Sequence, residues 1–198
     1  MEGVAREEQF RGQRGSPAMF DEIEVEAFIG AVNFIADQRQ PQPSGMGADL
    51  VLLGTLARIY QVKRDGDGEY RVFARLASLR PGDRDFANNL TYFAVMTGQA
   101  DNVTVEKIAR DNFEAKPDNI YYRSTWALVL CRLAKANEAL RVLEPVSSDW
   151  TTSSAIAWAY GAALAGLGRT DEAKRIFDTI NPDKLSFQEI SWVHALLK

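Results

Sequence analysis

The stretch NEALRVLEPV, residues 137–146, returns further along the chain in altered form as DEAKRIFDTI, residues 171–180. Both copies set a small residue, Ala139 or Ala173, among larger apolar side chains at three- and four-residue steps. That spacing is typical of the apolar face of an amphipathic helix. The recurrence indicates an internal repeat, which bears on the fold more strongly than any single motif.

The interval that separates Ala139 from Ala173 recurs outside these two stretches. It also separates Ala127 from Gly161, Gly161 from Ala195, and Trp158 from Trp192. Small side chains allow two antiparallel helices to approach closely, while larger residues fill the space around the contact. Each helix pair leaves one apolar face uncovered, so neighbouring pairs must stack. The pattern therefore predicts helical hairpins that stack into a superhelix.

This pattern resembles the tetratricopeptide repeat, a helix–turn–helix unit of about 34 residues with small residues at two fixed positions. The resemblance covers residues 48–198 and implies an all-α fold, an α-solenoid of about four such repeats with N- and C-terminal helical caps. In the second repeat Thr91 and Val105 take the small-residue positions, and its inter-helix turn is expected to be two residues longer. The repeats are expected at about 50–83, 84–117, 118–151 and 152–185, with a capping helix at 186–198.

Turn sequences rich in Gly, Pro, Asn and Asp separate the helical patterns after Ala48, and no segment is convincing as a strand. The expected helices span residues 48–63, 69–79, 84–97, 103–115, 119–134, 137–146, 152–166, 171–179 and 186–198. Residues 1–19 lack apolar periodicity and are predicted to form a flexible tail. Residues 20–47 are predicted to form a helix, at 20–39, followed by a Pro/Gly linker in which PQPSGMG breaks the helix.

Composition excludes several classes of protein. The 198 residues carry a net charge of -4, and a mildly acidic chain without a basic stripe is not expected to bind nucleic acid. A single cysteine, Cys131, rules out an internal disulfide framework, and a single histidine, His194, rules out a clustered histidine metal site. No run approaches the roughly 18 apolar residues of a membrane span. We expect a cytoplasmic protein by default, with a periplasmic location left open if an upstream signal was removed.

Motifs that carry chemistry are missing from the sequence. The run Asp65-Gly66-Asp67-Gly68 suggests a calcium loop, but in that register Lys63 and Ala74 occupy positions that need carboxylates. The sequence has neither a Gly-rich phosphate loop followed by Lys-Ser/Thr nor a serine nucleophile elbow. We therefore expect no enzyme, and no cofactor or metal site.

The resemblance places the first helix of each repeat on a concave face and implies which side chains line the groove there. The implied groove residues are aromatic, amide-bearing or charged for the most part: Arg58, Gln61, Asn88, Tyr92, Met96, Tyr121, Ser124, Arg132, Trp158 and Trp192. Aromatic residues and arginine are what protein interfaces favour. A second interpretation stays open, in which the aromatic residues are core between repeats and Trp158 and Trp192 join the fourth repeat to its cap.

The function that the resemblance implies is a non-catalytic scaffold for protein–protein interaction, with a peptide or a partner helix in the concave groove. The identity of that partner does not follow from the sequence. Two alternatives stay open: a self-associating repeat domain, whose end helices pair between copies, and a regulatory or recruiting domain of a larger enzyme or membrane-associated complex.

Overall fold

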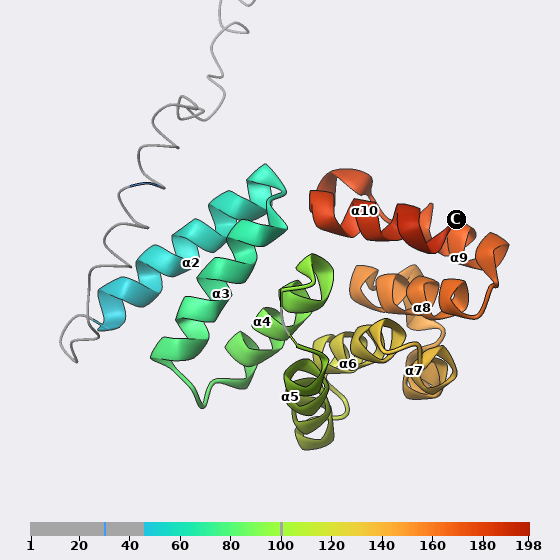
Figure 1. Cartoon of the computed structure of the whole chain (residues 1–198), viewed down its shortest axis with the longest axis horizontal. Helices are drawn as coiled ribbons and strands as arrows, with labels where there is room; N and C mark the ends of the chain where they lie inside the picture. The colour runs from blue at the N-terminus through green and yellow to red at the C-terminus, as the bar shows by residue number, and fades with distance from the viewer. Residues whose placement is uncertain (1–29, 31–45, 100) are drawn as a thin grey trace, which may run out of the picture. The chain divides into compact units, whose positions relative to one another are not determined.

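Nine α-helices and no strand make up the part of the chain that the structure, a computed structural model, describes: residue 30, residues 46–99 and residues 101–198 (Figure 1). The described helices lie in the unit formed by residues 41–198. The tail expected at 1–19 and, apart from Gly30, the helix expected at 20–39 lie outside the described residues. The prediction of an all-α fold is confirmed for the residues described.

All nine helices expected after residue 47 are present, and α4 matches its expected range to the residue. The helices are α2 (Met46–Lys63), α3 (Gly66–Leu79), α4 (Arg84–Thr97), α5 (Asn102–Ala115), α6 (Ile120–Arg132), α7 (Ala136–Leu143), α8 (Ser154–Gly166), α9 (Thr170–Phe177) and α10 (Phe187–Leu196). Three short 3-10 turns lie between them: η2 (Glu144–Val146), η3 (Asp149–Thr151) and η4 (Pro182–Lys184).

Two boundaries differ from expectation by three residues: α7 ends at Leu143, where η2 begins, and α3 begins early, inside the Asp-Gly-Asp-Gly run. The Asp65 carboxylate accepts a hydrogen bond from the Gly68 backbone N–H at 2.9 Å and so caps the new helix. A side-chain oxygen in this place satisfies a backbone donor that has no partner within the helix. Asp83, Asn119 and Ser153 cap α4, α6 and α8 in the same way. The Asp-Gly-Asp-Gly run therefore contains both the end of the turn after α2 and the first residues of α3.

Helix lengths repeat at the interval seen in the sequence. Helix α6 begins at residue 120 and α8 at residue 154, and each is 13 residues long. Helices α7 and α9 begin at residues 136 and 170, which is the same offset, and each is 8 residues long. Both follow a residue in the left-handed region, Ala134 at φ 57° and Gly168 at φ 74°. The two C-terminal hairpins thus share their lengths, their spacing and their turn conformation.

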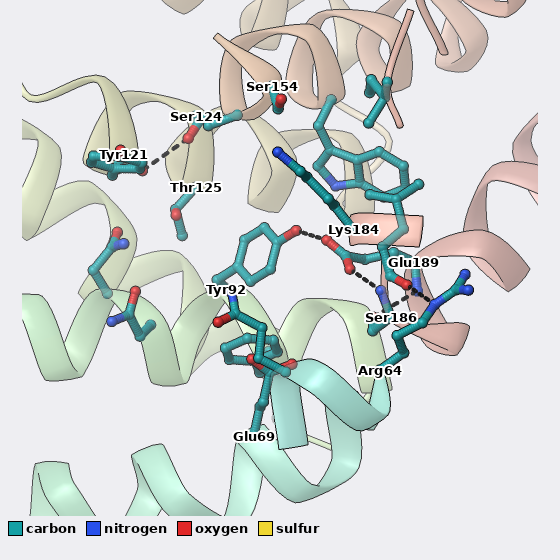
Figure 2. A pocket seen from close by; sticks show the side chains of 18 of the residues that line it. Arg64, Glu69, Tyr92, Tyr121, Ser124, Thr125, Ser154, Lys184, Ser186 and Glu189 are labelled. Carbon is teal, nitrogen blue, oxygen red and sulfur yellow. Dashed lines mark hydrogen bonds between the residues drawn. The ribbon is translucent and has the colours of Figure 1, made fainter. Parts of the chain in front are cut away.

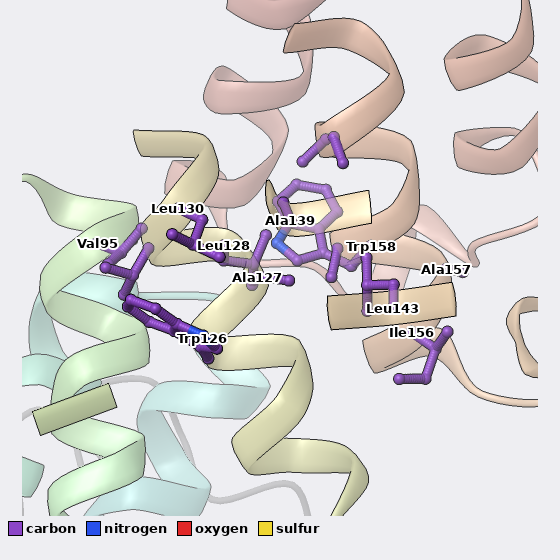
Figure 3. Close-up of a cluster of buried hydrophobic side chains, with 14 of the residues drawn as sticks. Val95, Trp126, Ala127, Leu128, Leu130, Ala139, Leu143, Ile156, Ala157 and Trp158 are labelled. Atoms are coloured by element: carbon purple, nitrogen blue, oxygen red, sulfur yellow. The ribbon is translucent and has the colours of Figure 1, made fainter. Parts of the chain in front are cut away.

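Packing joins these helices in chain order. From α2 to α9 each helix contacts the next, and α4, α6 and α8 also contact one another in turn. Figure 3 shows part of the buried cluster, in which Ala127 and Ala139 lie among larger side chains such as Leu143. Ala127, Ala139 and Ala173 are all 0% exposed. A Cβ atom built on Gly161 would lie 2.7 Å from the Phe177 ring, so α8 and α9 approach too closely there for any side chain.

Helix α10 breaks this order. It contacts α8, close to it in the chain, but also α3 and α4, which lie far earlier in the chain (Figure 1). The backbone N–H of Phe187 donates to the carbonyl oxygen of Arg64 at 3.0 Å. The C-terminal helix is therefore attached to the turn between α2 and α3.

Two glycine substitutions are expected to move stability in opposite directions. A Cβ on Gly68 would lie 2.2 Å from the buried ring of Tyr60, so Gly68→Ala should lower the free energy of unfolding by about 1–3 kcal/mol through overpacking. Gly54, inside α2, has open space around its Cβ position, so Gly54→Ala should raise it by up to about 1 kcal/mol. Urea unfolding of both variants checks this, and equal effects would contradict the packing of α2 on α3.

Candidate functional site

A cavity of about 350 Å³ lies among the described helices, and we call it the central pocket. Its walls come from α2, α3, α4, α6 and α8, from the residue Arg64 between α2 and α3, and from residues 180–189 at the start of α10. Figure 2 shows Tyr121 and Ser124 on one side and Tyr92 and Glu189 pointing toward each other. The pocket thus lies where helices from both halves of the sequence meet.

Six of the ten predicted groove residues line this pocket. They are Gln61, Asn88, Tyr92, Tyr121, Ser124 and Trp158. They come from the first helix of each expected repeat. Because these helices recur at a constant interval, the repeat pattern in the sequence was enough to assign their side chains to one surface. Trp158 is only 2% exposed and packs at a tilt against the rings of Phe177 and Trp192, so its ring is also part of the core.

The other four predicted residues lie elsewhere. Met96 and Trp192 line a separate, more open depression between α4 and α10. Arg58 is exposed on α2 and is not among the pocket's lining residues. Arg132 is exposed at the end of α6, near Gly98. The ten residues therefore divide between the central pocket and three other places.

Arg64 attaches the C-terminal segment to one edge of the pocket. Its Nε donates to the carbonyl oxygen of Leu185 at 2.7 Å, and its Nη2 donates to that of Pro182 at 2.8 Å. Its guanidinium carbon lies 5.2 Å from the centre of the Phe187 ring, within the range of a cation–π contact. Arg64 itself has φ 59°, a left-handed conformation that costs a non-glycine residue roughly 1–2 kcal/mol. The contacts of its side chain offset that strain.

The first turn of α10 adds a second set of contacts with the same region. The Gln188 side chain accepts from the backbone N–H of Gly66 at 3.0 Å and donates to the Asp67 carboxylate at 2.6 Å. The Tyr92 hydroxyl donates to the Glu189 carboxylate. Helix α10 is therefore held by α3 and α4 through polar groups.

Two carboxyl groups, those of Glu69 and Glu189, lie in the wall of the pocket. Each residue is only 8% exposed. Glu189 accepts from the Ser186 backbone N–H at 2.6 Å, and Ser186 accepts in return from the Glu189 N–H at 3.2 Å, the reciprocal pair of a capping box. No hydrogen bond or ion pair reaches the Glu69 carboxyl from the described residues.

Burial raises the pKa of Glu69 to about 8, with the negative charges of Glu189 and Asp65 as further causes. Burial also raises the pKa of Tyr92 well above its usual value of 10, and the charge of Glu189 adds to that shift because ionised Tyr92 would face it. At neutral pH Glu69 therefore carries a proton for most of the time. The Glu69 carboxyl is therefore a neutral acid in the wall of the pocket at this pH.

Two further polar atoms in the wall lack a partner. The side-chain oxygen of Asn88 and the indole N–H of Trp158 are both buried, and neither has a hydrogen-bond partner. A buried polar group left without a partner costs about 1–3 kcal/mol. The wall thus holds one unmatched acceptor and one unmatched donor beside the carboxyl groups.

Other kinds of site are not found in the described part of the chain. Residues 46–99 and 101–198 contain no group of three or more His, Cys, Asp or Glu residues arranged to hold a metal ion. Within the same residues no helix is both long enough and apolar enough to cross a membrane. His194 is exposed on α10, and burial raises the pKa of the Cys131 thiol to about 12.

Sequence reasoning did not single out Arg64, Glu69, Lys184, Ser186 or Glu189, all of which line the pocket. The only local signal was Ser186 followed by Glu189 three residues later, which is the pattern of a capping box. The capping box predicts where a helix begins, but it gives no sign that this helix contacts α3 and α4.

Removing the Arg64 side chain is expected to loosen α10. Arg64→Ala deletes two hydrogen bonds to backbone carbonyls and the contact with Phe187, and it should lower the free energy of unfolding by about 1–3 kcal/mol. Amide hydrogen exchange should rise in residues 187–196, while the buried helix α6 exchanges as in the wild type. Arg141→Ala, on the exposed face of α7, is the control and should change neither quantity. Unchanged exchange in α10 would contradict the attachment described above.

Titration of Glu69 is expected to make stability fall as the pH rises. Its pKa is about 8 in the folded protein and near the ordinary value of 4.5 in the unfolded chain, so between these values the folded state holds one more proton. The free energy of unfolding therefore decreases with rising pH across that window, on the order of a few kcal/mol in all. Urea unfolding at pH 5.5, 7 and 9 measures the slope.

Glu69→Gln should remove this contribution, because the amide does not titrate. Glu138→Gln, at an exposed position of α7, is the matched control and should keep the wild-type slope. A wild-type slope in Glu69→Gln would show that another group causes the pH dependence.

Comparison with known proteins finds no matching family model, no matching curated protein and no matching solved structure. The function proposed below therefore rests on the geometry, burial and charges of the central pocket.

Proposed function

We propose that this chain is a non-catalytic binding module, an α-solenoid of about four tetratricopeptide-like repeats that holds a short extended segment of another protein in the central pocket. The equal offsets from α6 to α8 and from α7 to α9 support the repeats. The α4–α5 hairpin supports them less directly. Its helices begin at residues 84 and 102, a wider spacing than that of α6 and α7, which begin at residues 120 and 136. Helix α4 is one residue longer than α6, so the turn after α4 exceeds the turn after α6 by one residue, against the two expected in the second repeat.

One observation carries the proposal: a cavity whose wall combines aromatic rings with polar atoms that lack partners. Tyr92, Tyr121 and Trp158 supply the rings, and Asn88 and Trp158 supply the unpartnered atoms. Aromatic side chains provide a large contact area at small entropic cost. A peptide backbone carries both a donor and an acceptor at nearly every residue, so it suits a wall with both kinds of unmatched group.

The small size of the cavity favours a ligand that inserts only part of its length. The cavity measures about 350 Å³, which is near the lower end of ligand pockets in general. We therefore favour a peptide that inserts a few side chains, in place of the partner helix that an uncovered groove could have received.

A second candidate function is self-association through α2. Val51 and Val62 are 70% and 83% exposed, and a separation of eleven residues places them on the same side of the helix. Light scattering coupled to size exclusion distinguishes the two candidates, since self-association predicts a dimer that Val51→Lys dissociates, whereas peptide binding needs no dimer.

Filling the pocket is expected to abolish peptide binding. Ala155 lines the pocket from α8 and is half-buried, so Ala155→Trp should occupy the cavity without disturbing the main core. Ala115→Trp, at an exposed position of α5, adds the same side chain away from the pocket and is the control. Random peptides displayed on phage and selected on the wild type should bind Ala115→Trp equally and Ala155→Trp at least tenfold more weakly. Equal binding to all three proteins would overturn the proposal.

A further inference from the structure

We propose that the central pocket is specific for a guanidinium group, that of an arginine side chain in the bound peptide, which would lie between the carboxyl groups of Glu69 and Glu189. This inference rests on the function proposed above and names the chemistry that its ligand must carry.

The wall presents more acceptors than the described residues satisfy. Glu69, only 8% exposed, receives no hydrogen bond from the described residues. Glu189 receives two, from Tyr92 and from the Ser186 N–H, and an ionised carboxylate has about four lone-pair sites. Asn88 also lines the pocket, and its side-chain oxygen has no partner but is covered by protein atoms. A guanidinium group has five N–H donors in a planar fork and no acceptor, so it is the complement of such a wall.

The cations that the structure describes at the pocket do not neutralise these carboxyl groups. Arg64 lines the pocket, but its guanidinium donates to the carbonyl oxygens of Leu185 and Pro182 and lies 3.8 Å from Asp183. Lys184 also lines the pocket, and its residue is exposed on η4 with no ion pair among the described residues. Among the described residues, neither Glu69 nor Glu189 therefore forms an ion pair with a lysine or an arginine.

A bound cation would change the protonation of the wall. Glu69 is mostly neutral at pH 7 because burial and the charges of Glu189 and Asp65 raise its pKa to about 8. A guanidinium beside it favours the ionised form, so binding should release a proton. The charged groups near the site are Arg64, Lys184 and those two acids, and Tyr92 remains neutral across this range. The apparent affinity should therefore rise with pH up to about 8 and level off above it.

The test compares two peptides that differ by one charge. The tripeptide Gly-Arg-Gly, blocked at both ends, carries a guanidinium, and its citrulline counterpart has nearly the same shape without the charge. Calorimetric titration of the full chain should show the arginine peptide binding at least tenfold more tightly at pH 8. The arginine peptide's affinity should fall by severalfold to tenfold between pH 8 and pH 7, whereas that of the citrulline peptide should not change.

Glu69→Gln should remove the preference for arginine together with its pH dependence. This variant keeps the shape of the side chain, and its folding is checked independently by urea unfolding. Glu138→Gln is the matched control and should retain both properties. Equal affinity for the two peptides, or a preference for arginine that survives in Glu69→Gln, would overturn the inference.

A third probe, ethylguanidinium, separates this inference from the proposed function. If ethylguanidinium binds in a Glu69-dependent way while no displayed peptide binds the pocket, the cation site stands and the peptide-binding function is wrong. If selected peptides lacking arginine bind the wild type and not Ala155→Trp, while the guanidinium probes do not bind, the function stands and this inference is wrong.

Discussion

The close approach of neighbouring helices through small side chains is the constraint on which the rest of this structure depends. Ala127, Ala139 and Ala173 are fully buried, and Gly161 lies where any side chain would meet the ring of Phe177. Because these contacts recur at a constant spacing, they set the distance between α6, α7, α8 and α9. Two of the helices that line the pocket, α6 and α8, take their positions from this packing, so the chemistry of the pocket depends in part on residues that do not line it.

Much of the fold could be predicted from the sequence because its determinants are local. Helices after residue 47 follow from apolar periodicity and from turn residues, and the error at Gly66 arose where Asp65 could either end a turn or cap a helix. The interval between Ala139 and Ala173 likewise needs only comparison of the chain with itself. Local patterns therefore predicted the described helices and their order.

The pocket could be predicted only in part. Asn88, Tyr92 and Ser124 lie on helices whose spacing repeats, so periodicity was enough to bring them together. Arg64 and Glu69 take their role from α10, which meets them after a long intervening stretch of chain. Whether α10 reaches the turn between α2 and α3 depends on the combined effect of the crossing angles of all the helices between them. No local sequence pattern gives that combined effect, so the carboxyl groups of Glu69 and Glu189 in the wall were not predicted.

The attachment of α10 to Arg64 also affects how the chain would fold. In a stack of helices with only neighbouring contacts, the ends can fray independently and unfolding can spread inward from either one. Here hydrogen bonds join residue 64 to residues 182, 185 and 187. These hydrogen bonds can form only after the helices between them in the sequence have packed. Such long-range contacts form late and slow the final step of folding. Once these hydrogen bonds have formed, the two ends of the stack of helices no longer fray independently. The helices between the two ends therefore unfold more cooperatively than contacts between neighbouring helices alone would allow.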